Sequence, residues 1–139
     1  MNKETNAKAN HMKAVAELCP SVLHNRRVGL EEVAEYISGK CGMAASDVRH
    51  VLEEIRNSLL YFCATGATVK MDGIGVYAAG IDLDGDLKVN HRPDNYLTTR
   101  LNIPGVFRGE IRNRENIGKS YEELLALFDE LHPDDPITQ

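Results

Sequence analysis

The central segment of the chain reads Val69-Lys70-Met71-Asp72-Gly73-Ile74-Gly75-Val76-Tyr77. Apolar and polar residues alternate on either side of Asp72-Gly73, a dipeptide typical of tight turns between strands. The segment therefore predicts a β-hairpin. A nucleotide-binding loop is a poor explanation of the Gly-Ile-Gly triplet, because a glycine-rich phosphate loop must open a helix and a strand pattern follows here. The glycines instead indicate a turn that needs positive φ angles.

Two amphipathic helices are predicted before the hairpin, over residues 30–41 and 47–64. In both, apolar residues recur at helical spacing. Gly39 and Gly42 end the first helix, Ser46 is the expected N-cap of the second, and Gly66 closes it. The apolar positions are Leu30, Val33, Ala34, Ile37 and Cys41 in the first helix, and Val48, Val51, Leu52, Ile55, Leu59, Phe62 and Cys63 in the second.

The remaining segments predict shorter elements. Residues 81–89 have the pattern of a second hairpin that turns at Asp84-Gly85, and the alternation over residues 97–103 predicts a further strand. Residues 106–117 fit neither period. A helix over residues 121–131 begins with the capping box Ser120-Tyr121-Glu122-Glu123. Near the N-terminus, Pro20 stops a short helix whose apolar face is Met12, Val15, Ala16 and Cys19. We therefore expect an α+β fold.

Length and composition place the chain among small globular proteins. It has 139 residues, of which 42% are hydrophobic, and this is enough for one domain with a modest core. No apolar run is long enough for a transmembrane helix or a secretory signal, so we expect a cytoplasmic protein. The cysteines Cys19, Cys41 and Cys63 lack metal-ligand spacing and lie among apolar residues, which predicts buried free thiols.

Charge is distributed unevenly along the sequence. The formal net charge is −5, which excludes a uniformly basic nucleic-acid binder. Residues 88–119, however, contain seven Lys or Arg against three Asp or Glu, whereas residues 120–139 contain six acidic residues and no basic ones. This basic segment is either a solvated surface or a surface that contacts phosphate groups, with which Arg side chains pair well.

No group of residues in the sequence supports catalysis. Asp82, Asp84 and Asp86 have the spacing that opens a calcium loop, but Leu87 and Pro93 occupy the positions where such a loop needs Gly and Glu. An acidic turn is the simpler interpretation. The five histidines show no ligand spacing, and the sequence alone assembles no nucleophile–His pair. We therefore expect no enzyme activity, no metal, no cofactor and no small-molecule substrate.

The order of helix, long helix, strand, Gly-x-Gly, strand and arm-like loop resembles that of the HU/IHF family of bacterial DNA-binding proteins. The motifs that carry the resemblance are Val33-Ala34-Glu35-Tyr36-Ile37, Lys40-Cys41-Gly42-Met43, Asp47-Val48 and the segment 69–77. The resemblance implies an intertwined homodimer with a two-helix body, whose β-arms follow the DNA minor groove and insert a Pro between base steps. It also implies association with the nucleoid.

Together these observations predict three parts: an N-terminal extension with a short helix over 1–28, an HU-like domain over 29–117, and a C-terminal helix with an acidic tail over 118–139. We expect a non-catalytic, nucleoid-associated protein that contacts the DNA phosphate backbone with little sequence specificity. The alternative is an HU-like dimerisation or protein-interaction module that has lost DNA binding, because the candidate arm begins with acidic residues. The residues predicted to contact DNA are Lys88, Arg92, Arg100, Arg108, Arg112 and Arg114, with Pro93 as the wedge.

Overall fold

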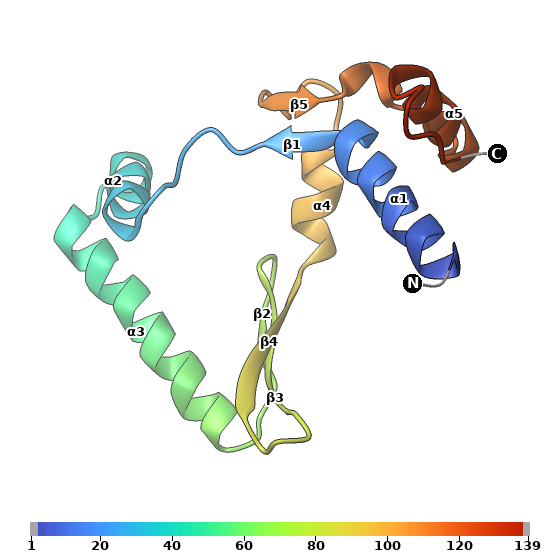
Figure 1. The fold of residues 1–139 in the computed structure, drawn as a ribbon. Helices are drawn as coiled ribbons and strands as arrows, with labels where there is room; N and C mark the ends of the chain where they lie inside the picture. Colours follow the sequence, from blue (N-terminus) through green and yellow to red (C-terminus); the bar gives the residue numbers. More distant parts are fainter. Residues whose placement is uncertain (1–2, 138–139) are drawn as a thin grey trace. The chain divides into compact units, whose positions relative to one another are not determined.

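The computed structural model describes residues 3–137, which combine α-helices with antiparallel sheets (Figure 1). The described chain is therefore an α+β protein, as the sequence predicts. It forms two compact units. The central unit is the continuous segment Arg26–Arg108, and the terminal unit combines Met1–Asn25 with Gly109–Gln139.

The central unit begins with two helices that pack against each other, α2 (Leu30–Cys41) and α3 (Ala45–Ala64). α2 ends at Gly42, whose φ of 73° is a left-handed conformation that glycine adopts without strain. α3 begins two residues before its predicted start, so its N-cap is Ala44 instead of Ser46. Within residues 3–137, no helix, the 20-residue α3 included, has both the length and the apolarity to cross a membrane.

A three-stranded antiparallel sheet follows α3. Its strands are β2 (Val69–Met71), β3 (Gly75–Ile81) and β4 (Leu87–Pro93), in the order β2-β3-β4. Both predicted hairpins are confirmed. The first turns at Asp72-Gly73, and the second turns within residues 82–86, at Leu83-Asp84 instead of the predicted Asp84-Gly85. β2 pairs only with residues 75–77 of β3, so the rest of β3 and β4 continues as a two-stranded ribbon (Figure 1).

Gly75 is the position where the sheet tolerates no side chain. Its φ is 157°, and it pairs with Met71 on one side and with Pro93 on the other. A Cβ atom built on Gly75 lies 2.5 Å from the carbonyl oxygen of Arg92 and 2.6 Å from Nε2 of His91. Because a backbone oxygen cannot move aside cheaply, only glycine allows β3 to approach β4 this closely.

A helix replaces the strand that the sequence predicts over residues 97–103. α4 (Asn95–Leu101) follows β4 directly, and the Asp94 carboxylate caps it by accepting a hydrogen bond from the N–H of Tyr96 at 2.8 Å. The strand prediction was wrong because Leu97 and Leu101 are four residues apart, a spacing that fits one face of a helix as well as one face of a strand. The N-cap then decides in favour of the helix.

The terminal unit is built from both ends of the described chain. Its elements are α1 (Lys3–Leu18), β1 (Ser21–Leu23), β5 (Glu110–Arg112), the short 3₁₀ helix η1 (Arg114–Asn116) and α5 (Tyr121–Leu131). β1 pairs antiparallel with β5, and α1 packs against α5. The core between the helices consists of Ala14, Leu18, Leu124, Leu125 and Phe128.

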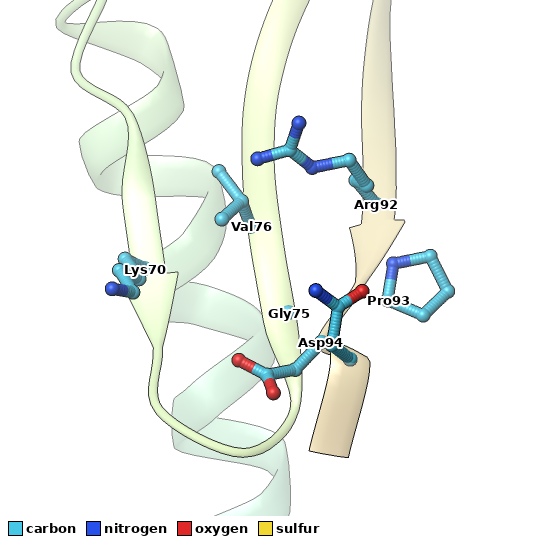
Figure 2. Close-up of a pocket in the computed structure, with 7 residues that line it drawn as sticks. Lys70, Gly75, Val76, Arg92, Pro93 and Asp94 are labelled. Atoms are coloured by element: carbon cyan, nitrogen blue, oxygen red, sulfur yellow. The ribbon is translucent and has the colours of Figure 1, made fainter. Parts of the chain in front are cut away.

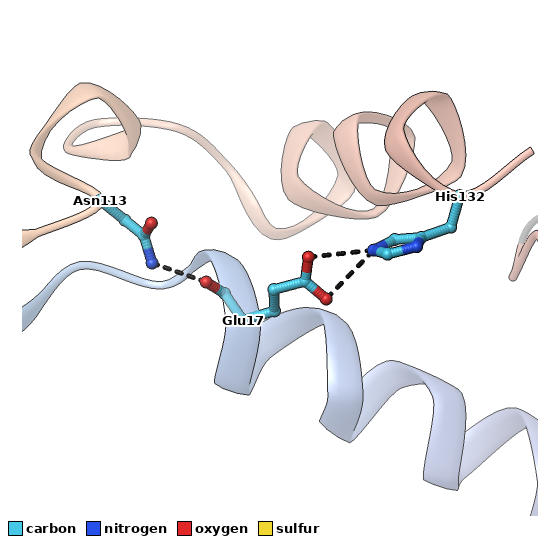
Figure 3. Close-up of polar contacts among 3 residues, drawn as sticks. All are labelled: Glu17, Asn113 and His132. Atoms are coloured by element: carbon cyan, nitrogen blue, oxygen red, sulfur yellow. Dashed lines mark hydrogen bonds and ion pairs between the residues drawn. The ribbon is translucent and has the colours of Figure 1, made fainter.

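Polar contacts also join the two halves of the terminal unit (Figure 3). The side-chain amide of Asn113 donates to the carbonyl oxygen of Glu17 at 2.6 Å, and the amide of the buried Asn116 donates to that of Leu18 at 2.8 Å. The Glu17 carboxylate in turn contacts Nε2 of His132 at 2.9 Å. The carbonyls at the C-terminal end of α1, which lack partners within the helix, therefore receive donors from a segment near the other end of the chain.

The structure corrects two predictions about burial. On α1 the buried positions are Ala14 and Leu18, whereas Met12, predicted on the apolar face, is 72% exposed. The buried face is set by contact with α5, which the sequence of the first helix does not reveal. Of the cysteines, Cys63 is buried, Cys19 is half-buried and Cys41 is exposed, so buried thiols were correctly predicted only in part. The capping box of α5, in contrast, is confirmed.

We expect Gly75→Ala to lower the free energy of unfolding by about 2 kcal/mol or more, because the substitution combines a disfavoured φ angle with a backbone clash. Gly39→Ala is the matched control: it lies inside α2 with no heavy atom within 4 Å of the added Cβ. That substitution should stabilise the protein by about 0.5–1 kcal/mol. Urea unfolding measures both, and equal stability of the two variants would contradict this account of Gly75.

We expect Asn116→Ala to loosen the terminal unit selectively. Loss of the buried amide leaves the Leu18 carbonyl without its donor, at a cost of about 1–3 kcal/mol. Amide hydrogen exchange should therefore accelerate in α1 and α5 and stay unchanged in α3. Asn102→Ala is the control, because Asn102 is exposed and bonds only within its own turn of chain, to the Thr98 carbonyl. Unchanged exchange in α1 of the Asn116 variant would show that the bond from Asn116 to the Leu18 carbonyl does not stabilise the end of α1.

Candidate nucleic-acid interface

The β2–β3–β4 sheet has two chemically different faces. Residues that pair directly across antiparallel strands project on the same side. The first face therefore carries three rows, which are Lys70–Val76–Arg92, Ala78–Asn90 and Gly80–Lys88. All three cations of the sheet strands thus lie on one face, which we name the basic face.

The middle of the basic face is lined by small residues. From Val76 through Ala78 to Gly80, the side chains of β3 become smaller along the strand. The Asn90 side chain lies over Gly80, where an added Cβ would be 2.6 Å from Nδ2 of Asn90. The longer side chains of β4 therefore stand beside small residues of β3, which leaves the charged end of Lys88 accessible.

A hollow of about 350 Å³ opens at the end of the basic face that is nearest α4 (Figure 2). Lys70 and Arg92 supply its positive charge, and Asp94 is the acidic residue in its lining. The Asp94 carboxylate already accepts the N–H of Tyr96, so it is engaged in capping α4. With two cations and one carboxylate in its lining, the hollow has a net positive charge that favours an anion. Arg and Lys side chains both bind phosphate oxygens. The lining residues are Lys70, Gly75, Val76, Arg92, Pro93, Asp94 and Asn95.

Two other cations of the central unit, Arg26 and Arg49, are paired with neighbouring carboxylates. Arg26 donates two hydrogen bonds to Glu32, each 2.7 Å long, which raise the pKa of Arg26 and lower the pKa of Glu32. Arg49 contacts both Glu31 and Glu53. Lys88 and Arg92, by comparison, form no ion pair within residues 3–137, and Nζ of Lys70 is 4.0 Å from Asp72. On the basic face, the charges of Lys88 and Arg92 are therefore not compensated by an ion pair within the described residues.

The predicted DNA-contacting residues lie on several elements. Lys88, Arg92 and Pro93 share β4, and Arg108 follows α4 at the end of the central unit. Arg100 is on α4 and not on a strand, and its guanidinium lies over the ring of Tyr96 at 5.0 Å. The two remaining residues belong to the terminal unit, Arg112 on β5 and Arg114 on η1.

Pro93 does not lie at the tip of the ribbon. It ends β4 and pairs with Gly75, whereas the tip is the turn over residues 82–86. A proline is tolerated there because β4 is an edge strand. The sequence predicts Pro93 as the wedge of a β-arm, and the strand register assigns it to the base of the ribbon.

Lys70 is the basic-face residue that the sequence analysis missed. It lies outside the basic segment 88–119, on the far strand of the first hairpin. The sequence nevertheless contained the signal. In the alternating segment 69–77, a hairpin that turns at Asp72-Gly73 places Lys70 opposite Val76, on the same face of the sheet. Locating Arg92 opposite Val76 additionally requires the register of the second hairpin, which the sequence did not fix.

The opposite face of the sheet is apolar and largely uncovered. Tyr77 stacks on His91 with ring centroids 4.4 Å apart, and Val69 pairs with Tyr77 on the same side. Farther along the ribbon, Leu87 is 76% exposed and Val89 is 58% exposed. Such a continuous apolar strip on one side of a ribbon indicates a surface that a further protein element covers.

Comparison with protein-family models finds a match over more than half of the chain. No curated protein is significantly similar to the chain. A family model described as an HU domain fused to wHTH, Ig, or glycine-rich motif matches residues 1–96, which include α2, α3 and the whole three-stranded sheet. This match confirms the HU-like domain that the motifs of residues 30–81 predict. The chain, with its two-helix segment followed by a Gly-x-Gly hairpin and a ribbon, belongs to this HU-HIG family.

Proposed function

We propose that the protein binds duplex DNA through the phosphate backbone, as a homodimer of the nucleoid-associated type, with little readout of base sequence. The observation that carries the proposal is the clustering of Lys70, Lys88 and Arg92 on one face of the sheet. Membership of an HU-domain family supports it, because an HU-like domain suggests a nucleoid-associated DNA-binding protein. Phosphate contacts position a protein on DNA without reading its sequence, and the basic face offers cations but few groups suited to base edges.

The spacing of the three cations suits an extended polyanion better than a small ligand. Neighbouring strands lie about 4.8 Å apart, so Lys70 and Arg92 are separated by about 10 Å at the backbone. Lys88 and Arg92 are four residues apart on β4, or about 13 Å. Cations spread over this length of the basic face suit the successive phosphates of a duplex.

The low burial of apolar side chains in the central unit supports the proposed dimer. Within residues 26–108, the buried apolar side chains are Ala34, Val48 and Cys63. On the apolar stripe of α3, Val51 is 49% exposed and Phe62 is 47% exposed. Apolar burial contributes about 25 cal/mol per Å², and a lone central unit forgoes much of it. A second copy of the chain, related by a two-fold axis, would cover this stripe.

Arg100, Arg108, Arg112 and Arg114 remain predicted phosphate contacts outside the basic face. Among them, Arg112 and Arg114 belong to the terminal unit, so their substitution tests whether that unit takes part in DNA binding. Pro93 remains the predicted wedge, although its place at the base of the ribbon, beside the hollow, suits a positioning contact as well.

A protein-interaction module without DNA binding is the competing function. The net charge of −5 and the three carboxylates of the turn over residues 82–86 favour it. The two functions differ in how the isolated protein responds to salt. Phosphate binding releases counterions and weakens steeply as salt increases, whereas an interaction module shows no DNA binding at any salt concentration.

We expect Lys70→Gln/Arg92→Gln to weaken DNA binding at least tenfold in an anisotropy titration at low salt. The slope of log affinity against log salt should become shallower by about 0.9 per lost phosphate contact, or about 3.6 for a dimer that loses four. Arg26→Gln/Arg49→Gln is the matched control, because it removes the same charge from residues already paired with Glu. Equal loss in the control, or no DNA binding by the unmodified protein, would contradict the proposal.

We expect Val51→Glu/Phe62→Glu to convert a dimer into a monomer in sedimentation velocity at micromolar concentration. Placing carboxylates in an apolar interface costs several kcal/mol, which raises the dissociation constant by about two orders of magnitude or more. Asn57→Glu, at an exposed position elsewhere on α3, should leave the dimer intact. A stable monomer of the unmodified protein would exclude the dimer.

A further inference from the structure

The ribbon formed by β3 and β4 has a shape that fits a DNA groove. It continues past the end of β2 as two paired strands and ends in the turn over residues 82–86 (Figure 1). Every residue from Ile81 to Pro93 is exposed. The major groove of DNA admits a two-stranded ribbon of these dimensions, so size alone does not keep the ribbon out.

The tip of the ribbon is also apolar. Leu83, at the turn, is fully exposed at 106% of its reference surface. The neighbouring Ile81 and Leu87 are 67% and 76% exposed. Leucine is one of the side chains that proteins insert between base steps to kink a duplex. Shape and apolarity therefore both favour insertion of this tip into DNA.

The charge of the tip opposes insertion. Asp82 is part of the turn itself, because its Oδ1 atom accepts the N–H groups of Asp84 at 2.9 Å and of Asp86 at 3.0 Å. The carboxylates of Asp84 and Asp86 make no contact within residues 3–137, so they have no structural role in the turn. Their negative charge is held next to Leu83 by a turn that Gly85 closes with a φ of 87°.

The repulsion reaches only part of the basic face. Charges separated by more than about 10 Å are largely screened at about 0.1 M salt, and a strand advances about 3.4 Å per residue. Lys88 is two residues from Asp86, or about 7 Å, and lies within this range. Arg92 is six residues away, or about 20 Å, and Lys70 lies across the sheet from Arg92. A duplex is therefore attracted at the base of the ribbon and repelled at its tip.

We propose that the negative charges of Asp84 and Asp86 repel the DNA phosphates and so keep Leu83 out of the DNA grooves. The protein then holds duplex DNA against Lys70 and Arg92 without bending it. This inference rests on the proposed DNA binding and adds the geometry of the bound DNA: an unbent duplex that lies on the basic face and is kept away from the tip of the ribbon.

The test uses a 30-base-pair duplex with a fluorescent donor and acceptor on its two ends, titrated with full-length protein. The unmodified protein should bind without changing the energy transfer. Asp84→Asn/Asp86→Asn keeps the N–H groups that Asp82 accepts, and should bind about threefold to tenfold more tightly at 50 mM salt, with a smaller gain at 200 mM. Its complex should also show increased energy transfer, because the released tip bends the duplex.

Two further variants make the assignment specific. Asp134→Asn/Asp135→Asn removes the same charge from the terminal unit and should change neither affinity nor energy transfer. Leu83→Ala added to Asp84→Asn/Asp86→Asn should keep the tighter binding and lose the bending. Bending by the unmodified protein, an equal gain in the Asp134/Asp135 control, or no gain in the Asp84/Asp86 variant would each overturn the inference.

The experiment separates this inference from the proposed function. If the unmodified protein does not bind the duplex but the Asp84/Asp86 variant does, the proposed function is wrong and the repulsion by the tip is confirmed. If neither binds, both are wrong. If the unmodified protein binds and bends the duplex, the proposed function holds and the inference about Asp84 and Asp86 is wrong.

Discussion

The central unit depends on one constraint: the first residues of β3 pair with a neighbouring strand on each side. Residues 75–77 bond to β2 on one side and to β4 on the other, and Gly75 must lack a side chain for the second pairing to form. This pairing sets the register of the whole sheet. Because a shift of one residue would move every side chain to the other face, the same constraint gathers Lys70 and Arg92 on one side and Tyr77 and His91 on the other.

Local patterns predicted the local structure well, and the long-range structure poorly. Residues 30–66 and 69–89 carry clear periods and turn residues, and the structure confirms their helices and hairpins. α4 was missed because leucines four residues apart satisfy both periods in so short a segment. The basic face was only half predicted: Arg92 and Lys88 were identified from composition, but Lys70 required the register of two hairpins. The terminal unit was not foreseen, since its partners are distant in sequence and no local pattern links them.

The two units differ in charge in a way that the net value of −5 hides. The central unit holds ten basic and eleven acidic residues, so it is almost neutral. Most of the excess negative charge belongs to the terminal unit, above all to α5 and the residues that follow it. Overall charge is therefore a poor guide to what the central unit binds. The local balance on each face of its sheet is the relevant quantity, because screening limits electrostatic attraction to about 10 Å.

The side-chain amides that cap the end of α1 have a consequence for the order of events during translation. Asn116 is 98 residues away from the Leu18 carbonyl that it bonds. At about 5–20 residues per second, the ribosome needs about 5–20 s to produce this asparagine after α1 has been made. For that interval Leu18 has none of its native neighbours from α5, while α2, α3 and the sheet emerge and close their own contacts. The nascent chain thus carries α1 without its packing partner α5 while the central unit folds.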